Sequence, residues 1–260
     1  MKSEMGNKLG ALVAAGAMMV IVSSARADLT PVFAPASGEL SHVDILNHVY
    51  GAGFAGPLGA ASYTNGLVTA TRIDDVLAGG GLGSNLNMVS GAPGLPNTDQ
   101  FWVDGIASAT AEAKFAAFSQ EFGYDLGSGY TNLFDVTVAG PSGFDVSGSG
   151  VVHFPHNNPW QWVRSGAQGQ TYYSGNANNS DLLDHMVTYQ ITGASSAANE
   201  TVWLLLWEDL NGPLNGAGHS DRDFNDLAVE IRATVVPIPG ALVMAGLGVG
   251  IVGLIRRRMA

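Results

Sequence analysis

Alternating apolar and polar residues recur along the chain and predict a series of short β-strands. The stretch 67–73 alternates and is rich in β-branched residues, which favours a strand. The stretches 130–139 and 144–154 read in the same way, and the turn sequence Pro141-Ser142-Gly143 separates them. This spacing is typical of antiparallel strands joined by tight turns.

The C-terminal part carries the strongest strand signals. Residues 184–192 form one strand, and 201–207 (TVWLLLW) are continuously apolar, which predicts a strand buried on both faces. In 223–234, Leu227, Val229 and Ile231 alternate with more polar residues, which predicts one buried face. We expect the last two strands to pair as a hairpin.

Two segments fit more than one secondary structure. Residues 42–50 are compatible with a short helix or a strand. In 107–122, Phe115, Phe118 and Phe122 share one helical face, whereas the flanking turns favour a strand. Residues 160–164 form a further aromatic strand candidate, and the Gly- and Asn-rich stretches 79–98 and 165–180 are expected to be loops.

The N-terminus has the pattern of a secretory signal peptide. Lys2 and Lys8 precede an apolar run over 9–22, and Ala25 and Ala27 form an Ala-x-Ala-like cleavage site. We therefore predict a signal peptide over 1–27, export through the secretion translocon, and cleavage before Asp28.

The C-terminus predicts a transmembrane helix. Residues 235–255 contain no charge, and as a helix they would span roughly 30 Å, the thickness of a bilayer core. The arginine cluster Arg256, Arg257 and Arg258 follows at once and should stay on the cytoplasmic side. An ordinary C-terminal membrane anchor would explain these features.

A more specific interpretation comes from the residues before the helix, Val236, Pro237, Ile238, Pro239 and Gly240. Together with the helix and the arginines, they resemble the PEP-CTERM sorting signal of exopolysaccharide-associated bacterial proteins, with Ile238 replacing the usual glutamate. The resemblance implies that residues 237–260 are a sorting signal. An exosortase-like enzyme would cleave near the prolines, and the product would reach the cell surface or the extracellular matrix.

Between these ends, residues 28–236 form the predicted exported domain. They hold 21 acidic and five basic residues, a net charge of about −16, which argues against nucleic-acid binding and favours divalent cations. Cysteine is absent, so no disulfide or thiol chemistry is available. The 35 glycines of the chain favour many short strands. The predicted fold is mostly β, an antiparallel β-sandwich or jelly roll.

The densest chemistry is an acidic constellation on both sides of the loop 211–219. Calcium prefers six to eight oxygen ligands on loops, and six residues carry suitable oxygens. These candidate calcium ligands are Glu208, Asp209, Asp221, Asp223, Asn225 and Asp226. The spacing copies the first half of an EF-hand loop but lacks its glycine and its final glutamate. The alternative is that these acids cap turns and that one pairs with Arg222.

The same stretch resembles a known family. The segments 184–193, 202–210 and 220–231, with a Trp-Glu-Asp strand end and an Asp-x-Asp-Phe-Asn-Asp strand start, are similar to the domain of unknown function 4114. The resemblance covers about 184–232. It implies a β-sandwich-like domain with a calcium site.

No catalytic constellation is evident, and we expect no enzyme. His153 and His156 flank a proline and lack a zincin glutamate. Trp160 and Trp162 suit either the core or a sugar-stacking surface. The sequence therefore favours a non-enzymatic exported matrix protein, calcium-stabilised and associated with exopolysaccharide or biofilm. A carbohydrate-binding module of the same system is the alternative.

Overall fold

The computed structural model describes residues 29–73, 87–90, 100–138, 143–144, 146–166, 169–175, 178–197, 200–210 and 220–234. It contains one helix, α1 (His42–Tyr50), within these ranges. The described strands are β1 (Ser62–Thr64), β2 (Thr69–Arg72), β3 (Asn87–Ser90), β4 (Gln100–Lys114), β5 (Gln120–Asp125), β6 (Tyr130–Val138), β7 (Val146–Ser147), β8 (Ser149–Ser165), β9 (Thr171–Tyr173), β10 (Met186–Thr192), β11 (Glu200–Trp207) and β12 (Leu227–Thr234).

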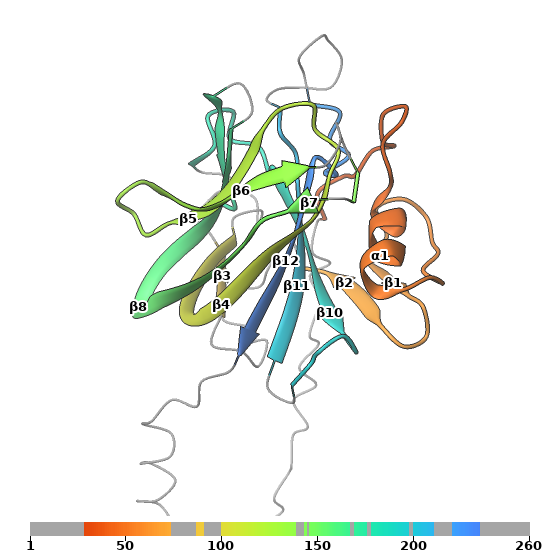
Figure 1. Ribbon diagram of the computed structural model, residues 1–260, viewed down its shortest axis with the longest axis horizontal. Coiled ribbons are helices and arrows are strands. Elements are labelled where there is room, and N and C mark those ends of the chain that lie inside the picture. The colour runs from red at the N-terminus through yellow and green to blue at the C-terminus, as the bar shows by residue number, and fades with distance from the viewer. Residues whose placement is uncertain are drawn as a thin grey trace, which may run out of the picture.

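The strands pair in antiparallel fashion, often with strands that are distant in the sequence, and they build two packed sheets. This confirms the predicted β-sandwich class (Figure 1). The strand order is β1-β2-β10-β11-β12-β4-β8-β5-β6-β7, with β3 beside β4 and β9 beside β8. Strand β8 belongs to both sheets. Its first part pairs with β4 and its last part, 161–165, pairs with β5.

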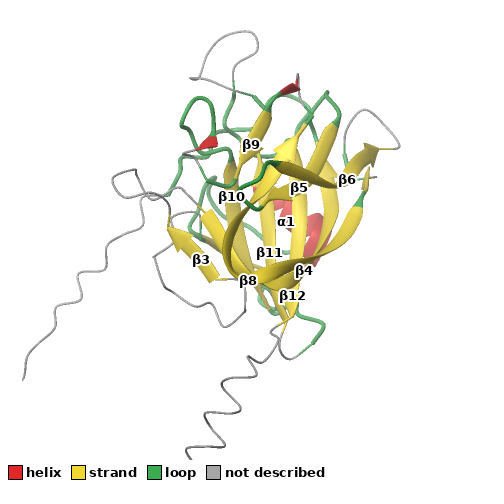
Figure 2. Ribbon diagram, turned by 90° about the vertical axis from the view of Figure 1, so that its left-hand side faces the viewer, coloured by secondary structure: helices red, strands yellow, loops and turns green. Residues whose placement is uncertain are grey.

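The sheet that contains β10, β11 and β12 is covered on both faces. Figure 1 places β5 and β6 on one side of these strands and α1 on the other, and Figure 2 shows α1 behind them. Along β11, Trp203, Leu205 and Trp207 enter the core between the sheets, whereas Leu204 and Leu206 enter the core under α1. The prediction of a doubly buried strand is confirmed.

Strand β12 corrects one prediction. Leu227, Val229 and Ile231 pack between the sheets as expected, but Ala228 is buried under α1 and Glu230 is only 7% exposed. The second face is therefore also covered. The period of two identified the core face correctly, but it gave no sign that a helix elsewhere in the chain covers the other face.

Both ambiguous segments resolve on local grounds. Residues 42–50 are helical because Ser41 and Asp44 form a capping box at the helix start. Most of 107–122 is strand, and its three phenylalanines do not share a face. Phe115 joins the core under α1 and Phe122 joins the core between the sheets, while Phe118 is exposed.

The remaining differences concern strand bounds and loops. The predicted strands 144–154 and 160–164 are largely parts of one strand, β8. Within the predicted loop 165–180 lies β9, and within 79–98 lies β3. The signal peptide and the C-terminal tail fall outside the described residues, and among the described residues no helix is long and apolar enough to cross a membrane.

Candidate metal centre

The hairpin β11–β12 assembles the acidic residues. Trp207 is paired with Leu227, so residues that follow β11 and residues that precede β12 meet at one end of the sheet. This confirms the predicted hairpin. Five of the six predicted ligands are buried there and Asp221 is half-buried; the loop 211–219, with His219, lies outside the described residues.

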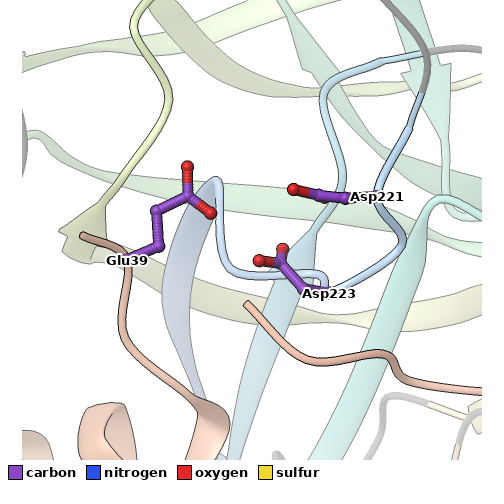
Figure 3. Close-up of side chains that lie close together, drawn as sticks. All are labelled: Glu39, Asp221 and Asp223. Carbon is purple, nitrogen blue, oxygen red and sulfur yellow. The ribbon is translucent and has the colours of Figure 1, made fainter. Parts of the chain in front are cut away.

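The carboxylates fall into two groups. The inner group consists of Glu208, Asp209 and Asp226. The outer group consists of Asp221, Asp223 and a residue not predicted from the sequence, Glu39. Within each group the ligand oxygens all lie within 4.8 Å of one another. Figure 3 shows the three outer carboxylates pointing toward a common space, with Glu39 reaching in from the N-terminal segment.

Positive charge lies beside the inner group. The Arg164 guanidinium is fully buried and its Nη2 lies 3.5 Å from Asp209 Oδ2. Gln120 links the two, since it accepts from Arg164 Nε and donates to Asp209 Oδ2 at 2.8 Å. Lys114 is also buried nearby. Burial lowers the pKa of its ammonium group, and the neighbouring Asp209 and Asp226 partly offset this. The inner group is therefore an internal ion network that ties β5, β8 and the β11 end together.

The outer group has no such compensation: among the described residues, no ion pair joins Glu39, Asp221 or Asp223 to a lysine or arginine. Burial, followed by the neighbouring Asp221 and Asp226, raises the pKa of Asp223 to about 9. Burial, followed by Asp221 and Asp223, raises the pKa of Glu208 to about 8. Glu208 therefore belongs electrostatically to both groups. Close carboxylates without a counter-ion favour either a bound proton or a cation.

The loop that carries Asp221 and Asp223 is held in a defined backbone conformation. Arg222 N donates to Glu208 Oε2 at 2.9 Å and to Ser220 Oγ at 3.1 Å. Arg222 and Phe224 have φ angles of 56° and 55°, in the left-handed region that non-glycine residues rarely adopt. Phe224 is fully buried under α1. The buried ring fixes the loop and so directs the flanking carboxylates.

Asn225 adds a neutral oxygen to this corner. Its side chain is fully buried, and Nδ2 donates to Asp223 Oδ2 at 2.8 Å and to Leu40 O at 2.9 Å. Its Oδ1 is buried without a hydrogen-bond partner. A buried unpaired amide oxygen is costly, and a cation ligated by that oxygen would remove the cost. Carboxylate and amide oxygens are the ligands that calcium prefers.

The aromatic candidates lie in the core. Trp160 and Trp162 are 1% and 0% exposed, and their rings meet edge to face at 4.7 Å. Trp162 also stacks on Phe122 at 5.1 Å. Tyr172 is buried as well. Neither tryptophan ring is accessible for stacking on a sugar.

The remaining predicted residues are quickly placed. His153 is exposed on β8, and His156 lies on the same strand rather than on a helix. The predicted signal-cleavage residues and the sorting-signal residues fall outside the described residues. They are Ala25, Ala27, Val236, Pro237, Ile238, Pro239, Gly240, Arg256, Arg257 and Arg258.

Two residues of this corner, Glu39 and Arg164, are not predicted from the sequence, for different reasons. Glu39 stands in a proline-containing segment about 180 residues from its partners, and no local pattern links it to them. Arg164 lies in an aromatic strand, but it is one of only five basic residues between 28 and 236. An arginine inside an apolar strand needs a buried carboxylate as its partner. The acidic constellation is the densest source of such carboxylates in the sequence, so the pairing could have been predicted.

With this geometry established, comparison with known proteins gives one family. Residues 148–234 match the family described as Domain of unknown function (DUF4114). The resemblance noted over 184–232 is thereby confirmed, and it extends upstream to include β8, β9 and Arg164. The match includes the hairpin and both Asp221 and Asp223, but it excludes Glu39. No curated protein sequence matches the chain.

Solved structures with some similarity are bacterial lectins, at low scores. They include the Chromobacterium violaceum lectin CV2L in complex with alpha-methyl-fucoside, at 15% identity and a TM-score of 0.32. The Ralstonia solanacearum high-affinity mannose-binding lectin has 18% identity and a TM-score of 0.31. The C-terminal domain of the Burkholderia cenocepacia lectin BC2L-C has 15% identity and a TM-score of 0.30. Each similarity covers 52% of this chain, and 91%, 91% and 97% of the respective lectin chains.

The raised pKa values predict an inverted pH dependence of stability in the metal-free protein. Glu208 and Asp223 have folded-state pKa values of about 8 and about 9, above the ordinary values near 4 expected on unfolding. The folded state therefore holds protons that the unfolded state releases. Their stabilising contribution is complete below about pH 4 and is lost as the pH rises toward 8 to 9.

Thermal unfolding of the metal-free protein at pH 5 and pH 8 checks this, with the lower midpoint expected at pH 8. The double variant Glu208→Gln, Asp223→Asn serves as the control and should show a smaller pH dependence. A midpoint that is independent of pH in the unmodified protein, or the same slope in the variant, would contradict the assignment.

Proposed function

We propose that this protein is a non-enzymatic, exported surface or extracellular-matrix protein whose outer carboxylate group binds calcium. The observation that carries the proposal is the convergence of Glu39, Asp221 and Asp223 without a compensating cation. Glu208 and Asn225 complete a ligand set of mostly anionic oxygens, the chemistry that calcium requires. The inner residues Asp209 and Asp226 were predicted as ligands too, but Asp209 already pairs with Arg164 and Asp226 accepts a hydrogen bond from Asp209 N, and we assign both a supporting role.

Calcium would act here as a structural ion. Its charge would offset repulsion among carboxylates that come from both sides of the β11–β12 hairpin and from the N-terminal segment. The buried histidines are held by residues of the core: His42 contacts Tyr189 Oη at 2.9 Å, and His185 contacts Asp181 at 3.1 Å. These pairings support a structural role for both histidines.

Export and sorting complete the proposal. Strand β12 ends at Thr234, so cleavage by an exosortase-like enzyme near Pro237 to Gly240 would leave the sandwich intact. At the other end, Thr30 is buried and donates to Asp184 at 2.7 Å, so cleavage before Asp28 would preserve this contact. The secreted product would then lie in an exopolysaccharide or biofilm matrix.

Carbohydrate binding is the second candidate function. A hollow of about 390 Å³ beside α1 is of a size that accommodates small ligands. It is lined by Ser41, Val43, Phe54, Leu58 and Tyr63, among others. Trp160 and Trp162 would not take part, because they are buried. The fucoside and mannose named for the lectins belong to those proteins, and the similarity is too weak to transfer them.

Removal of the outer carboxylates tests calcium binding. Calcium at about 100 times its dissociation constant stabilises a protein by about 2.7 kcal/mol, which corresponds to roughly 5–10 °C in the unfolding midpoint here. The variant Asp221→Ala, Asp223→Ala should lose this increase, while its midpoint in chelator should change little. Thermal unfolding with calcium and with chelator decides the matter. Equal losses in both buffers would count against a calcium site.

Intact mass and cell fractionation test the sorting proposal. The protein from its native host should start at Asp28, end between Pro237 and Gly240, and be found at the cell surface or in the medium. A form that retains Arg258 in the inner membrane would instead indicate an ordinary anchor.

A glycan array tests the second candidate. Wild-type protein should bind, Leu58→Trp should block the hollow, and Leu67→Trp should bind normally, since Leu67 is 88% exposed elsewhere on the surface. An array without signal would refute carbohydrate binding by the tested glycans.

A further inference from the structure

The segment 29–41, here called the leader segment, lies against the loop that carries the outer carboxylates. Phe33 N donates to Arg222 O at 3.0 Å. Leu40 O accepts from Asn225 Nδ2 at 2.9 Å. These two bonds join the leader segment to residues on both sides of Asp223, although about 180 residues separate them in the sequence.

The first turn of α1 continues the same contact. His42 is fully buried, with Nε2 2.8 Å from Asp223 O and Nδ1 2.9 Å from Tyr189 Oη. The backbone of Asp223 is thereby attached to α1, while its carboxylate faces Glu39 (Figure 3). The positions of the leader segment, of the first turn of α1 and of the acidic loop therefore depend on one another.

This arrangement has an electrostatic conflict at its centre. The hydrogen bonds bring Glu39 up to Asp221 and Asp223, and the like charges oppose that approach. Docking of the leader segment is consequently weakened whenever the three groups are ionised and no cation is present. A divalent ion reverses the sign of this effect. The amide of Asn225, whose Nδ2 bonds to Asp223 Oδ2 and whose Oδ1 is buried without a partner, would supply a further oxygen ligand.

We propose that Glu39 is a calcium ligand and that calcium occupancy locks the leader segment and α1 onto the sandwich. The inference rests on the proposed calcium site. It adds a ligand from outside residues 148–234, the part that matches the family, and it assigns the ion a second effect. Loss of calcium releases the leader segment and loosens the packing of α1 on the core beneath it. The two sheets of the sandwich remain folded.

Two measurements on the full-length protein in mild detergent test the lock, with calcium chloride as the probe. Titration calorimetry should show that Glu39→Gln weakens calcium binding by about tenfold, as expected for the loss of one anionic ligand. Hydrogen exchange read by mass spectrometry should show that calcium slows exchange in 29–50 about tenfold in the wild type and not in Glu39→Gln.

Asp135→Asn is the matched control, because Asp135 is an exposed carboxylate on β6 and its side chain bonds, among the described residues, to nearby Asn132. It should behave as the wild type in both measurements. Glu39→Asp, which keeps the charge on a shorter side chain, should give intermediate affinity. In chelator above pH 9, where Asp223 is ionised, Glu39→Gln should unfold at or above the wild-type midpoint, since a repulsive charge is gone.

The outcomes separate the lock from the site on which it depends. If the wild type binds calcium and Glu39→Gln binds it equally, with exchange in 29–50 independent of calcium, the lock is wrong and the calcium site stands. If the wild type binds no calcium, the proposed calcium role fails and the lock fails with it.

Discussion

Burial of β11 on both faces is the constraint on which the rest of the structure depends. Trp203, Leu205 and Trp207 fill one core while Val202, Leu204 and Leu206 fill the other. A slip of one residue would exchange these two sets, placing indoles under α1 and smaller side chains between the sheets. The register is therefore strongly specified. It fixes the Trp207–Leu227 pairing, and hence the position of every carboxylate that follows β11 or precedes β12.

Two solutions to the problem of buried negative charge stand side by side at this end of the sandwich. Among the inner carboxylates, Asp209 pairs within the chain with Arg164 of β8, and Gln120 bonds to both. The outer carboxylates have no internal counter-ion among the described residues. Only five basic residues lie between 28 and 236, so balance from outside the chain is the simpler route for such an acidic domain. The same corner thus contains one carboxylate paired with a buried arginine and three carboxylates without an ion pair among the described residues.

Sequence reasoning found the parts of this structure that depend on local pattern. It predicted the β-sandwich class, the doubly buried β11, the hairpin and the acidic constellation, because periodicity and strand ends are visible along the chain. It missed the burial of the second face of β12 and the role of Glu39, because both arise from the N-terminal segment folding back over the C-terminal hairpin. The pattern of 42–50 fits either a helix or a strand, although Ser41 and Asp44 have the spacing of a capping box, which is the local signal for a helix.

The direction of β12 has a consequence for the environment of the corner. The strand starts at Leu227, next to Asp226, and its eight residues reach Thr234 in seven steps of roughly 3.3 Å, a span of about 23 Å. At physiological ionic strength the Debye length is about 8 Å. A charged surface at the far end of β12 is thus nearly three screening lengths from Asp221 and Asp223. The electrostatic environment of Asp221 and Asp223 is therefore set by the bulk medium and not by charges at the far end of β12.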